Sequence, residues 1–304
     1  PPFDPEKFLK GEISPVTFGS AKQNFGVDIF LQFFCQFAPG VQPRLAQARN
    51  ETNKVFGELQ AMSPLDSNFS GFVFKIQANM DRRHRDRIAF IRICSGRFER
   101  GMKVKHSREE KDLRLSYSNQ FIANEKATVD EAFAGDIVGV ADTGHFAIGD
   151  SVSSERVMKF EDIPKFAPEL FARMTVQDAM RRKKMQEALN HLSEEGAIQL
   201  FIDPLIGAQD PIIGVVGELQ FEVLVHRMQD EYNLEVRLQR LSFSVARWPR
   251  TAENKAVETL KGNFTIYRDM IDQPVILLNQ EWDLNWAQKE NPDVVFASSI
   301  SRAR

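Results

Sequence analysis

The order of helical and strand-like segments between residues 170 and 240 constrains the fold more than any other feature of this sequence. Apolar residues recur at i, i+3, i+4 and i+7 in two stretches, 185–192 and 221–228, as they do on one face of a helix. We expect both apolar faces to pack on a sheet. The runs expected to form its strands are LFARMTV (170–176), AIQLFI (197–202), IIGVV (212–216) and LEVRL (234–238). The order β-α-β-β-α-β is that of the ferredoxin-like split βαβ unit, so we predict an α+β domain over residues 163–304.

The segment before it, residues 69–162, has the pattern of a small β-barrel. Phe72, Phe74 and Ile76 share one face of a strand, and the same two-residue period recurs in later short runs. Many short strands with frequent turns favour a closed barrel whose loops form a binding rim. The fold class is therefore mixed β and α+β. The glycines expected to mark turns are Gly96, Gly101, Gly135, Gly144 and Gly149.

The first 68 residues divide into two pieces. Residues 16–21 (VTFGSA) are typical of a strand end, and a helix is expected to follow and to end near Pro39. Residues 41–68 are polar and show no sustained period, so we interpret them as a linker or an elaborated loop. The apolar face expected of the helix consists of Val27, Phe30, Leu31 and Phe34.

Residues 282–292 (WDLNWAQKENP) predict an amphipathic helix near the end of the chain. The proline at its end is expected to stop the helix. Trp282 and Trp286 lie one turn apart in it, and we expect them to pack onto the preceding domain.

Composition indicates a cytoplasmic protein. A chain of 304 residues with 42% hydrophobic content can form about two cores of ~150 residues each. No apolar run approaches the ~18 residues of a bilayer span, and no export signal is visible.

Cys35 and Cys94 lie in apolar surroundings outside any CxxC spacing, so we expect reduced core thiols. The five histidines show no paired ligand spacing, so we expect no metal site. The chain begins with Pro1 and is expected to be a fragment.

Positive charge is concentrated in one stretch of the chain. Residues 69–118 contain thirteen Lys and Arg against six Asp and Glu, a net charge of +7 in a chain whose total is −3. The run RRHRDR (82–87) lies between two strand-like runs and therefore predicts a basic loop. Such a local field attracts phosphate backbones, although a well-solvated hairpin surface is the alternative interpretation. Because guanidinium forks match phosphate oxygens, the candidate RNA contacts are Arg82, Arg83, Arg85, Arg87 and Arg97.

No complete active site is visible in the sequence. There is no GxxxxGK[ST] phosphate loop and no GxSxG elbow. Asn53-Lys54-Val55 lacks the acidic fourth residue of a guanine-reading NKxD, because Phe56 stands there. Glu194-Glu195 is a possible carboxylate pair, but adjacent acids at a helix end point in different directions, which favours a solvated turn.

Several long runs resemble translational GTPases. GSAKQNFGV (19–27) resembles the last nucleotide-contacting motif of these proteins, in which backbone N–H groups of a Ser-Ala-x turn donate to the guanine O6. SGFVFKIQANMDRRHRDRIAFIRICSGRFERGMKV (70–104) is similar to their second domain, an elongation-factor-Tu-domain-2-like barrel. The later pieces resemble the third domain of the peptide chain release factor 3 family: PELFARM (168–174), LSEEGAIQLF (192–201) and VGELQFEVLVHRMQDEYN (216–233). The resemblance covers roughly residues 13–295.

The resemblance implies a protein that binds and hydrolyses GTP with Mg²⁺, engages rRNA and ribosomal proteins, and promotes departure of a class I release factor. The expected domains are the end of a GTPase domain (1–40), the linker (41–68), the barrel (69–162) and the α+β domain (163–304). Ser20, Ala21 and Lys22 would complete a guanine pocket in the intact protein. The phosphate loop, both switches and NKxD would precede Pro1, so we expect this segment alone to bind no cofactor and to be inactive. A weaker candidate contact for RNA or a ribosomal protein, with a solvated face as the alternative, is Arg181, Arg182, Lys183 and Lys184.

Two other functions remain open at this point. An elongation-factor-G-like translocase or ribosome protection protein is expected to continue for two more domains beyond the split βαβ unit. This chain continues for about 65 residues, and its last run WAQKENPDVVF (286–296) also resembles the release factor. An unrelated α+β metabolic enzyme is disfavoured by the missing catalytic motif and by the basic barrel. Neither a membrane nor DNA is an expected partner.

Overall fold

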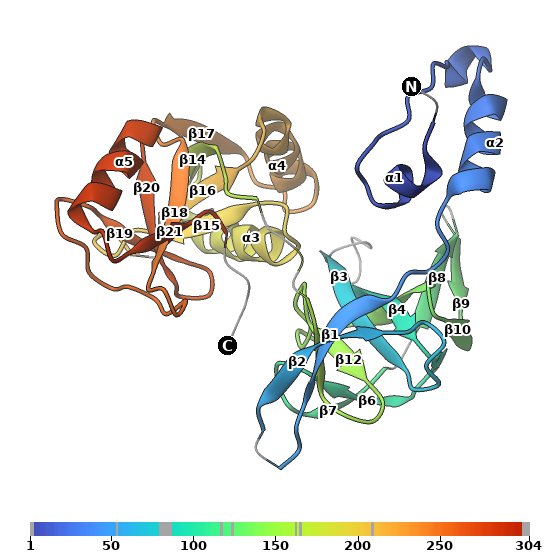
Figure 1. Cartoon of the computed structure of the whole chain (residues 1–304). Coiled ribbons are helices and arrows are strands. Elements are labelled where there is room, and N and C mark those ends of the chain that lie inside the picture. The colour runs from blue at the N-terminus through green and yellow to red at the C-terminus, as the bar shows by residue number, and fades with distance from the viewer. Residues whose placement is uncertain are drawn as a thin grey trace.

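The computed structural model describes residues 3–52, 54–78, 87–115, 118–122, 125–161, 163, 166–207 and 210–299. Figure 1 shows an N-terminal helical segment, a β-rich body and a C-terminal body with helices packed on a sheet. None of the described helices is long and apolar enough to cross a membrane.

The N-terminal segment contains α1 (Pro5–Leu9), the short 3-10 helix η1 (Ala21–Gln23) and α2 (Val27–Phe37). The helix expected here is confirmed, but the expected strand end is wrong. Residues 13–19 have no regular secondary structure, and Ser20 forms an isolated bridge with Phe25. The η1 turn occupies the residues between the two bridge partners, so the chain reverses there without forming a longer ladder.

The packed face of α2 also differs from the expected one. Phe33 and Phe37 contact the rings of Phe3 and Phe8 at centroid distances of 4.9–5.8 Å. The side chains of the expected apolar face are exposed, because no described element covers them: Phe30, Leu31 and Phe34. Cys35 is exposed as well, so the expectation of a core thiol is wrong there, whereas Cys94 is buried.

Residues 41–68 form a β-hairpin rather than the expected linker or loop. Strands β1 (Arg44–Arg49) and β2 (Phe56–Met62) pair antiparallel, and β1 also pairs with β13 (Met158–Phe160). The hairpin projects from the barrel in Figure 1. Within β1, Ala46 is the buried residue, and it packs in a small cluster with Phe72 and Phe160. Long-range pairing and this cluster, not an apolar period of its own, hold the hairpin in place.

The β-rich body has the barrel-like core that the sequence predicts. Its main sheet has the strand order β7-β6-β12-β3-β4-β11-β8-β9, and β10 pairs separately with β5. Apolar residues from β3, β4, β5, β6, β10, β11 and β12 meet in one core, which includes Ile91, Phe98, Val104 and Val152. The strands are β3 (Ser70–Ala78), β4 (Arg87–Ser95), β5 (Arg97–Glu99), β6 (Lys103–His106), β7 (Asp112–Arg114), β8 (Ser118–Ile122), β9 (Glu125–Thr128), β10 (Glu131–Phe133), β11 (Ile137–Ala141) and β12 (Ser151–Ser153).

The split βαβ unit of the C-terminal body is confirmed. The order β17-β14-β16-β15 is antiparallel throughout, which is the order 4-1-3-2 of this unit in sequence numbering. Both helices bury the predicted stripes on one face of the sheet, except that Val225 is only half-buried. Its elements are β14 (Leu170–Val176), η2 (Ala179–Arg181), α3 (Arg182–Glu194), β15 (Gln199–Ile202), β16 (Ile212–Val215), α4 (Glu218–Asp230) and β17 (Val236–Leu241).

The last part of the chain extends this sheet to eight strands. The added strands are β18 (Val245–Arg250), β19 (Ile266–Asp269), β20 (Pro274–Leu278) and β21 (Val295–Ala297), and β19 joins the unit at β15. The predicted helix is α5 (Glu281–Glu290), but it packs through Leu284 and Ala287. The expectation that both tryptophans pack onto the domain is wrong for Trp282, which is 67% exposed; Trp286 contacts Phe264 at 4.9 Å between ring centroids.

Candidate functional site

The Ser20–Lys22 turn is a tight loop held by its own backbone. Ser20 N–H donates to Phe25 O (2.9 Å), Phe25 N–H donates to Ser20 O (3.1 Å), and the Ser20 hydroxyl accepts from Gln23 N–H (3.4 Å). A Cβ at Gly26 would lie 2.4 Å from Phe18 O, so only glycine allows the two ends of the loop to approach this closely.

Two backbone donors of this turn take no part in its hydrogen bonds. Ala21 and Lys22 occupy the first positions of η1, where helical N–H groups have no partner within the helix. Over the described residues, the structure assigns no acceptor to either N–H. The turn can therefore donate to an external acceptor, as a guanine O6 would require.

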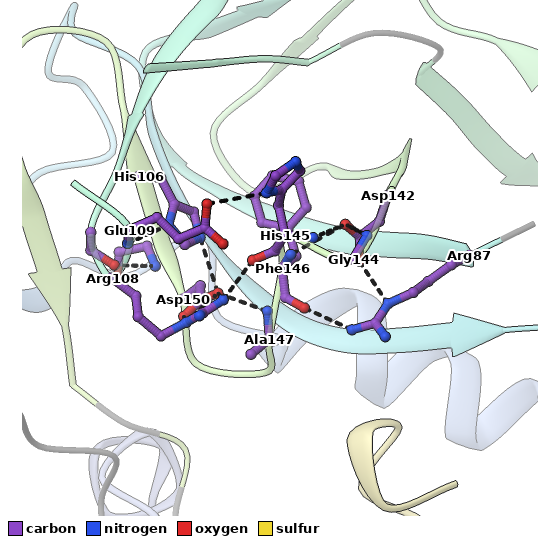
Figure 2. A network of polar contacts seen from close by, with 12 residues as sticks. Arg87, His106, Arg108, Glu109, Asp142, Gly144, His145, Phe146, Ala147 and Asp150 are labelled. Atoms are coloured by element: carbon purple, nitrogen blue, oxygen red, sulfur yellow. Dashed lines mark hydrogen bonds and ion pairs between the residues drawn. The ribbon is translucent and has the colours of Figure 1, made fainter. Parts of the chain in front are cut away.

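Arg82, Arg83 and Arg85 lie outside the described residues, so their candidacy stays a prediction. Arg87, the last arginine of the basic run, begins β4. Its Nε donates to the Asp142 carboxylate (2.7 Å), one terminal nitrogen donates to Phe146 O (2.8 Å), and the other pairs with Glu194. Figure 2 shows the guanidinium turned toward Asp142 and Phe146. All three directions of the fork are occupied, so Arg87 is better placed to join protein segments than to contact phosphate.

Two buried carboxylates organise the loop between β11 and β12. Asp142 accepts the backbone N–H groups of Gly144, His145 and Phe146 at 2.8–3.2 Å. Asp150 accepts the Ala147 N–H at 2.7 Å. Both aspartates are shown in Figure 2 on either side of this loop. Neither was predicted from the sequence; a DxG turn followed by GD is the signal that could have indicated a carboxylate-capped loop.

A buried histidine and an arginine complete the Asp150 cluster. His106 Nδ1 accepts from the Glu109 N–H (3.0 Å), so the proton is on Nε2, which donates to Asp150 (3.0 Å). Arg108 donates to both Asp150 oxygens at 2.9–3.2 Å. Burial works to raise the pKa of Asp150, but hydrogen bonds from His106 and Arg108 overcome it and hold the pKa below its ordinary value. The Asp150 carboxylate is therefore ionised and surrounded by donors, which indicates a structural role.

The pair Glu194-Glu195 is only partly the solvated turn that the sequence favours. The two side chains do point to different partners: Glu194 to Arg87, and Glu195 to Arg227 at 2.7 Å. The Glu195 side chain is 7% exposed, so the solvated interpretation is wrong for it. Burial opposes the charge of Arg227, but its hydrogen bonds to Glu231 and Glu195 raise its pKa.

Arg97 is exposed but already has carboxylate partners. It pairs with Glu99 of the same strand and lies 3.3 Å from Glu131 of β10. The hydrogen bond to Glu99 raises the pKa of Arg97. An incoming phosphate would have to compete with both carboxylates, which makes Arg97 a weaker candidate than its charge alone suggests.

The second basic run is exposed at the start of α3. Arg181 donates to Asn233 O (2.8 Å) and lies 3.5 Å from Asp178. Arg182, Lys183 and Lys184 are exposed, and the structure assigns them no ion pair within the described part of the chain. Cations at a helix N-terminus oppose the helix dipole. An anion from outside would relieve this unfavourable arrangement.

Two further exposed cations lie opposite each other at the edge of the barrel sheet. Lys103 of β6 and Arg114 of β7 are cross-strand neighbours, and β7 is the edge strand. Like charges directly opposite each other on neighbouring strands are destabilising. Both residues contribute to the net charge of the basic stretch, but only the strand register places them together.

No group of three or more potential metal ligands occurs among the residues that the structure describes.

The comparisons with known proteins cover most of the chain. Residues 160–288 match the family described as "Class II release factor RF3, C-terminal domain", and residues 68–155 match "Elongation factor G domain 2".

Several curated relatives match nearly the whole chain. A protein named peptide chain release factor 3 from Symbiobacterium thermophilum is 45% identical over 298 residues, which are 98% of this chain and 54% of the relative. One of the same name from Listeria monocytogenes is 45% identical over 98% of this chain and 55% of its own length. The chain thus spans about half the length of these relatives. A crystal structure of a protein from Thermus thermophilus shares the fold, with a TM-score of 0.55 and 20% identity over 87% of this chain and 37% of that one.

Proposed function

We propose that this chain is the ribosome-binding portion of a GTP-dependent termination factor. The chain belongs to the peptide chain release factor 3 family, over the part of those proteins that it spans. In this proposal the whole protein acts in the cytoplasm and promotes dissociation of class I release factors after peptide release. The chain itself recognises the ribosome, while phosphate chemistry belongs to the remainder of the protein.

The nucleotide part of the proposal rests on the Ser20–Lys22 turn. The N–H groups of Ala21 and Lys22 have no acceptor in the described chain, which suits donation to a guanine O6 of GTP or GDP. None of the motifs that bind phosphates and Mg²⁺ occurs in this sequence. The turn would therefore complete a guanine pocket whose other residues lie elsewhere in the whole protein.

The observation that carries the ribosome-binding proposal is the exposed run Arg182-Lys183-Lys184 at the N-terminus of α3. These cations have no assigned ion pair in the described chain, and the helix dipole adds to their attraction for an anion. Lys103 and Arg114 offer a second surface of the same kind on the barrel. The closely spaced backbone phosphates of rRNA are anions that such surfaces can bind. Arg82, Arg83 and Arg85 remain proposed contacts on the sequence argument alone.

The test is binding of the chain to 70S ribosomes over a range of salt concentrations. We expect the Lys183→Gln/Lys184→Gln variant to bind more weakly and to lower the slope of log affinity against log salt by ~0.7–0.9 per lost phosphate contact. The matched control is Lys255→Gln/Lys289→Gln, which removes the same charge from exposed lysines elsewhere. Equal losses in both variants, or a weaker affinity with an unchanged slope, would exclude phosphate contact at α3.

A translocase function is the second candidate, because the barrel matches an elongation factor G domain. The barrel cannot separate the two functions, whereas the match over 160–288 favours the release factor. With the rest of the protein restored, we expect GTP-dependent release of a labelled class I factor from termination complexes. Acceleration of translocation without this release would assign the protein to the translocases.

A further inference from the structure

Arg87 lies where the barrel meets the C-terminal body. Its guanidinium joins segments that are far apart in sequence: the barrel loop after β11, through Asp142 and Phe146 O, and the end of α3, through Glu194. The function proposed above uses none of these contacts.

The barrel holds Arg87 in place independently of the C-terminal body. The Asp142 side chain is fully buried, and its second oxygen accepts three backbone N–H groups of the loop. A buried carboxylate requires a counter-charge, and Arg87 supplies it at 2.7 Å. These barrel contacts therefore fix the orientation of the Arg87 guanidinium, including the terminal nitrogen that pairs with Glu194 (Figure 2).

Glu194 has different surroundings. It is the last residue of α3, its side chain is 42% exposed, and a carboxylate at a helix C-terminus is disfavoured by the helix dipole. Its neighbour Glu195 adds a second negative charge, although Arg227 of the same body pairs with that residue. The counter-charge that the structure assigns to Glu194 comes from Arg87, across the boundary between the two bodies.

Apolar packing around this contact is incomplete. A cavity of about 500 Å³ lies between the bodies, lined by Phe74 and Ile148 on the barrel side and by Ile198 and Leu200 on the other. At its rim, a Cβ on Gly196 would lie 3.2 Å from Ile148 Cδ1. Because close packing does not fix the two bodies against each other here, a directional polar contact contributes more to their orientation.

We propose that Arg87 is a positioning residue, which sets the orientation of the barrel relative to the C-terminal body through a contact with Glu194 that can open and close. Glu194 is the releasable side, since its exposed carboxylate can return to water, whereas Arg87 remains on Asp142. While it is closed, the contact keeps the distance and orientation between the two basic surfaces, at Lys103 and at Lys183, constant. The inference concerns the chain by itself and does not depend on ribosome binding.

Single-molecule energy transfer between dyes on the two bodies tests this proposal. Dyes attached at Lys103→Cys on β6 and Gln288→Cys on α5 report the distance in a Cys35→Ser background. Cys94 can stay, because burial raises its pKa to about 11 and keeps the thiol protonated. We expect one narrow population in the parent, and a broader or shifted one in Glu194→Gln, which removes the charge but leaves Asp142 and Phe146 on Arg87.

The matched control is Glu187→Gln, an exposed glutamate on the same helix. It should reproduce the parent distribution, and far-UV circular dichroism and unfolding midpoints of both variants should match the parent. Salt at ~1 M, where the Debye length is about 3 Å, should shift the parent toward the Glu194→Gln distribution and leave that variant unchanged. An unchanged distribution in Glu194→Gln, or an equal change in Glu187→Gln, would overturn the proposal.

Discussion

Replacing Gly96 with alanine will destabilise the barrel far more than replacing Gly101 with alanine. Both glycines have positive φ, +67° and +78°, and both flank the short strand β5. They differ in the space around them. A Cβ at Gly96 would lie 2.5 Å from the carbonyl carbon of Asn68 and from the nitrogen of Phe69, whereas nothing lies within 4 Å of one at Gly101.

The expected costs follow from this difference. Alanine with positive φ costs roughly 1–2 kcal/mol, and this is the whole cost at Gly101. At Gly96 the obstacle is backbone, so the chain at Asn68–Phe69 must move. That movement breaks the hydrogen bond from the Ser95 hydroxyl to Asn68 O (2.8 Å), worth about 1 kcal/mol, and disturbs the buried Phe69 ring, for about 1–3 kcal/mol more. We therefore expect a loss of at least ~3 kcal/mol for Gly96→Ala.

Urea unfolding followed by two signals can separate the bodies. The three tryptophans, Trp248, Trp282 and Trp286, all lie in the C-terminal body, so their fluorescence serves as an internal control while circular dichroism follows both bodies. Only the barrel transition should move in the Gly96 variant. Equal costs for the two substitutions would refute the steric argument, and a shift of the fluorescence transition would show that the damage is not local.

Two other groups in the barrel supply tests by pH. Burial raises the pKa of Cys94 from 9.0 to about 11, so its stabilising contribution is present below pH 9 and is lost as pH rises toward 11. The free energy of unfolding should therefore fall by about 2 kcal/mol between pH 8.5 and pH 11, and this loss should be absent in Cys94→Ala. Asp150→Asn should cost ~2–4 kcal/mol at pH 7, because Arg108 and His106 lose their common carboxylate. Since the pKa of Asp150 is lowered, its contribution to stability is present above pH 3.8 and is lost below. The difference in free energy of unfolding between parent and Asp150→Asn should therefore disappear in acid. A difference that stays constant with pH would contradict an ionised Asp150.

Periodicity predicted the elements that carry their own apolar face. In α3, the buried residues are those whose spacing identified the helix: Met185, Ala188, Leu189 and Leu192. The same holds for Phe221, Leu224 and Met228 in α4. These helices can be recognised from local sequence because each needs only one partner surface, the face of the sheet on which both of them pack.

Elements that depend on distant partners could not be found in this way. Strand β2 has no buried residue, and it forms because β1, its partner, is itself held by β13, about 110 residues later in the chain. The roles of Arg87 and Glu194 were missed for a similar reason. Their contact joins residues 107 positions apart, and no local pattern distinguishes an arginine that binds a buried aspartate from one that faces solvent.

The junction between β15 and β19 determines whether the split βαβ unit can be separated from the rest of the chain. In the isolated unit, β15 would be an outer strand with free N–H and C=O groups, and Phe201 would lose Trp248 and Tyr267 on its uncovered side. Such an edge is a template for pairing with other chains. Cutting the protein after β17 would thus yield an aggregation-prone module, and the smallest portable unit of this body runs through β21.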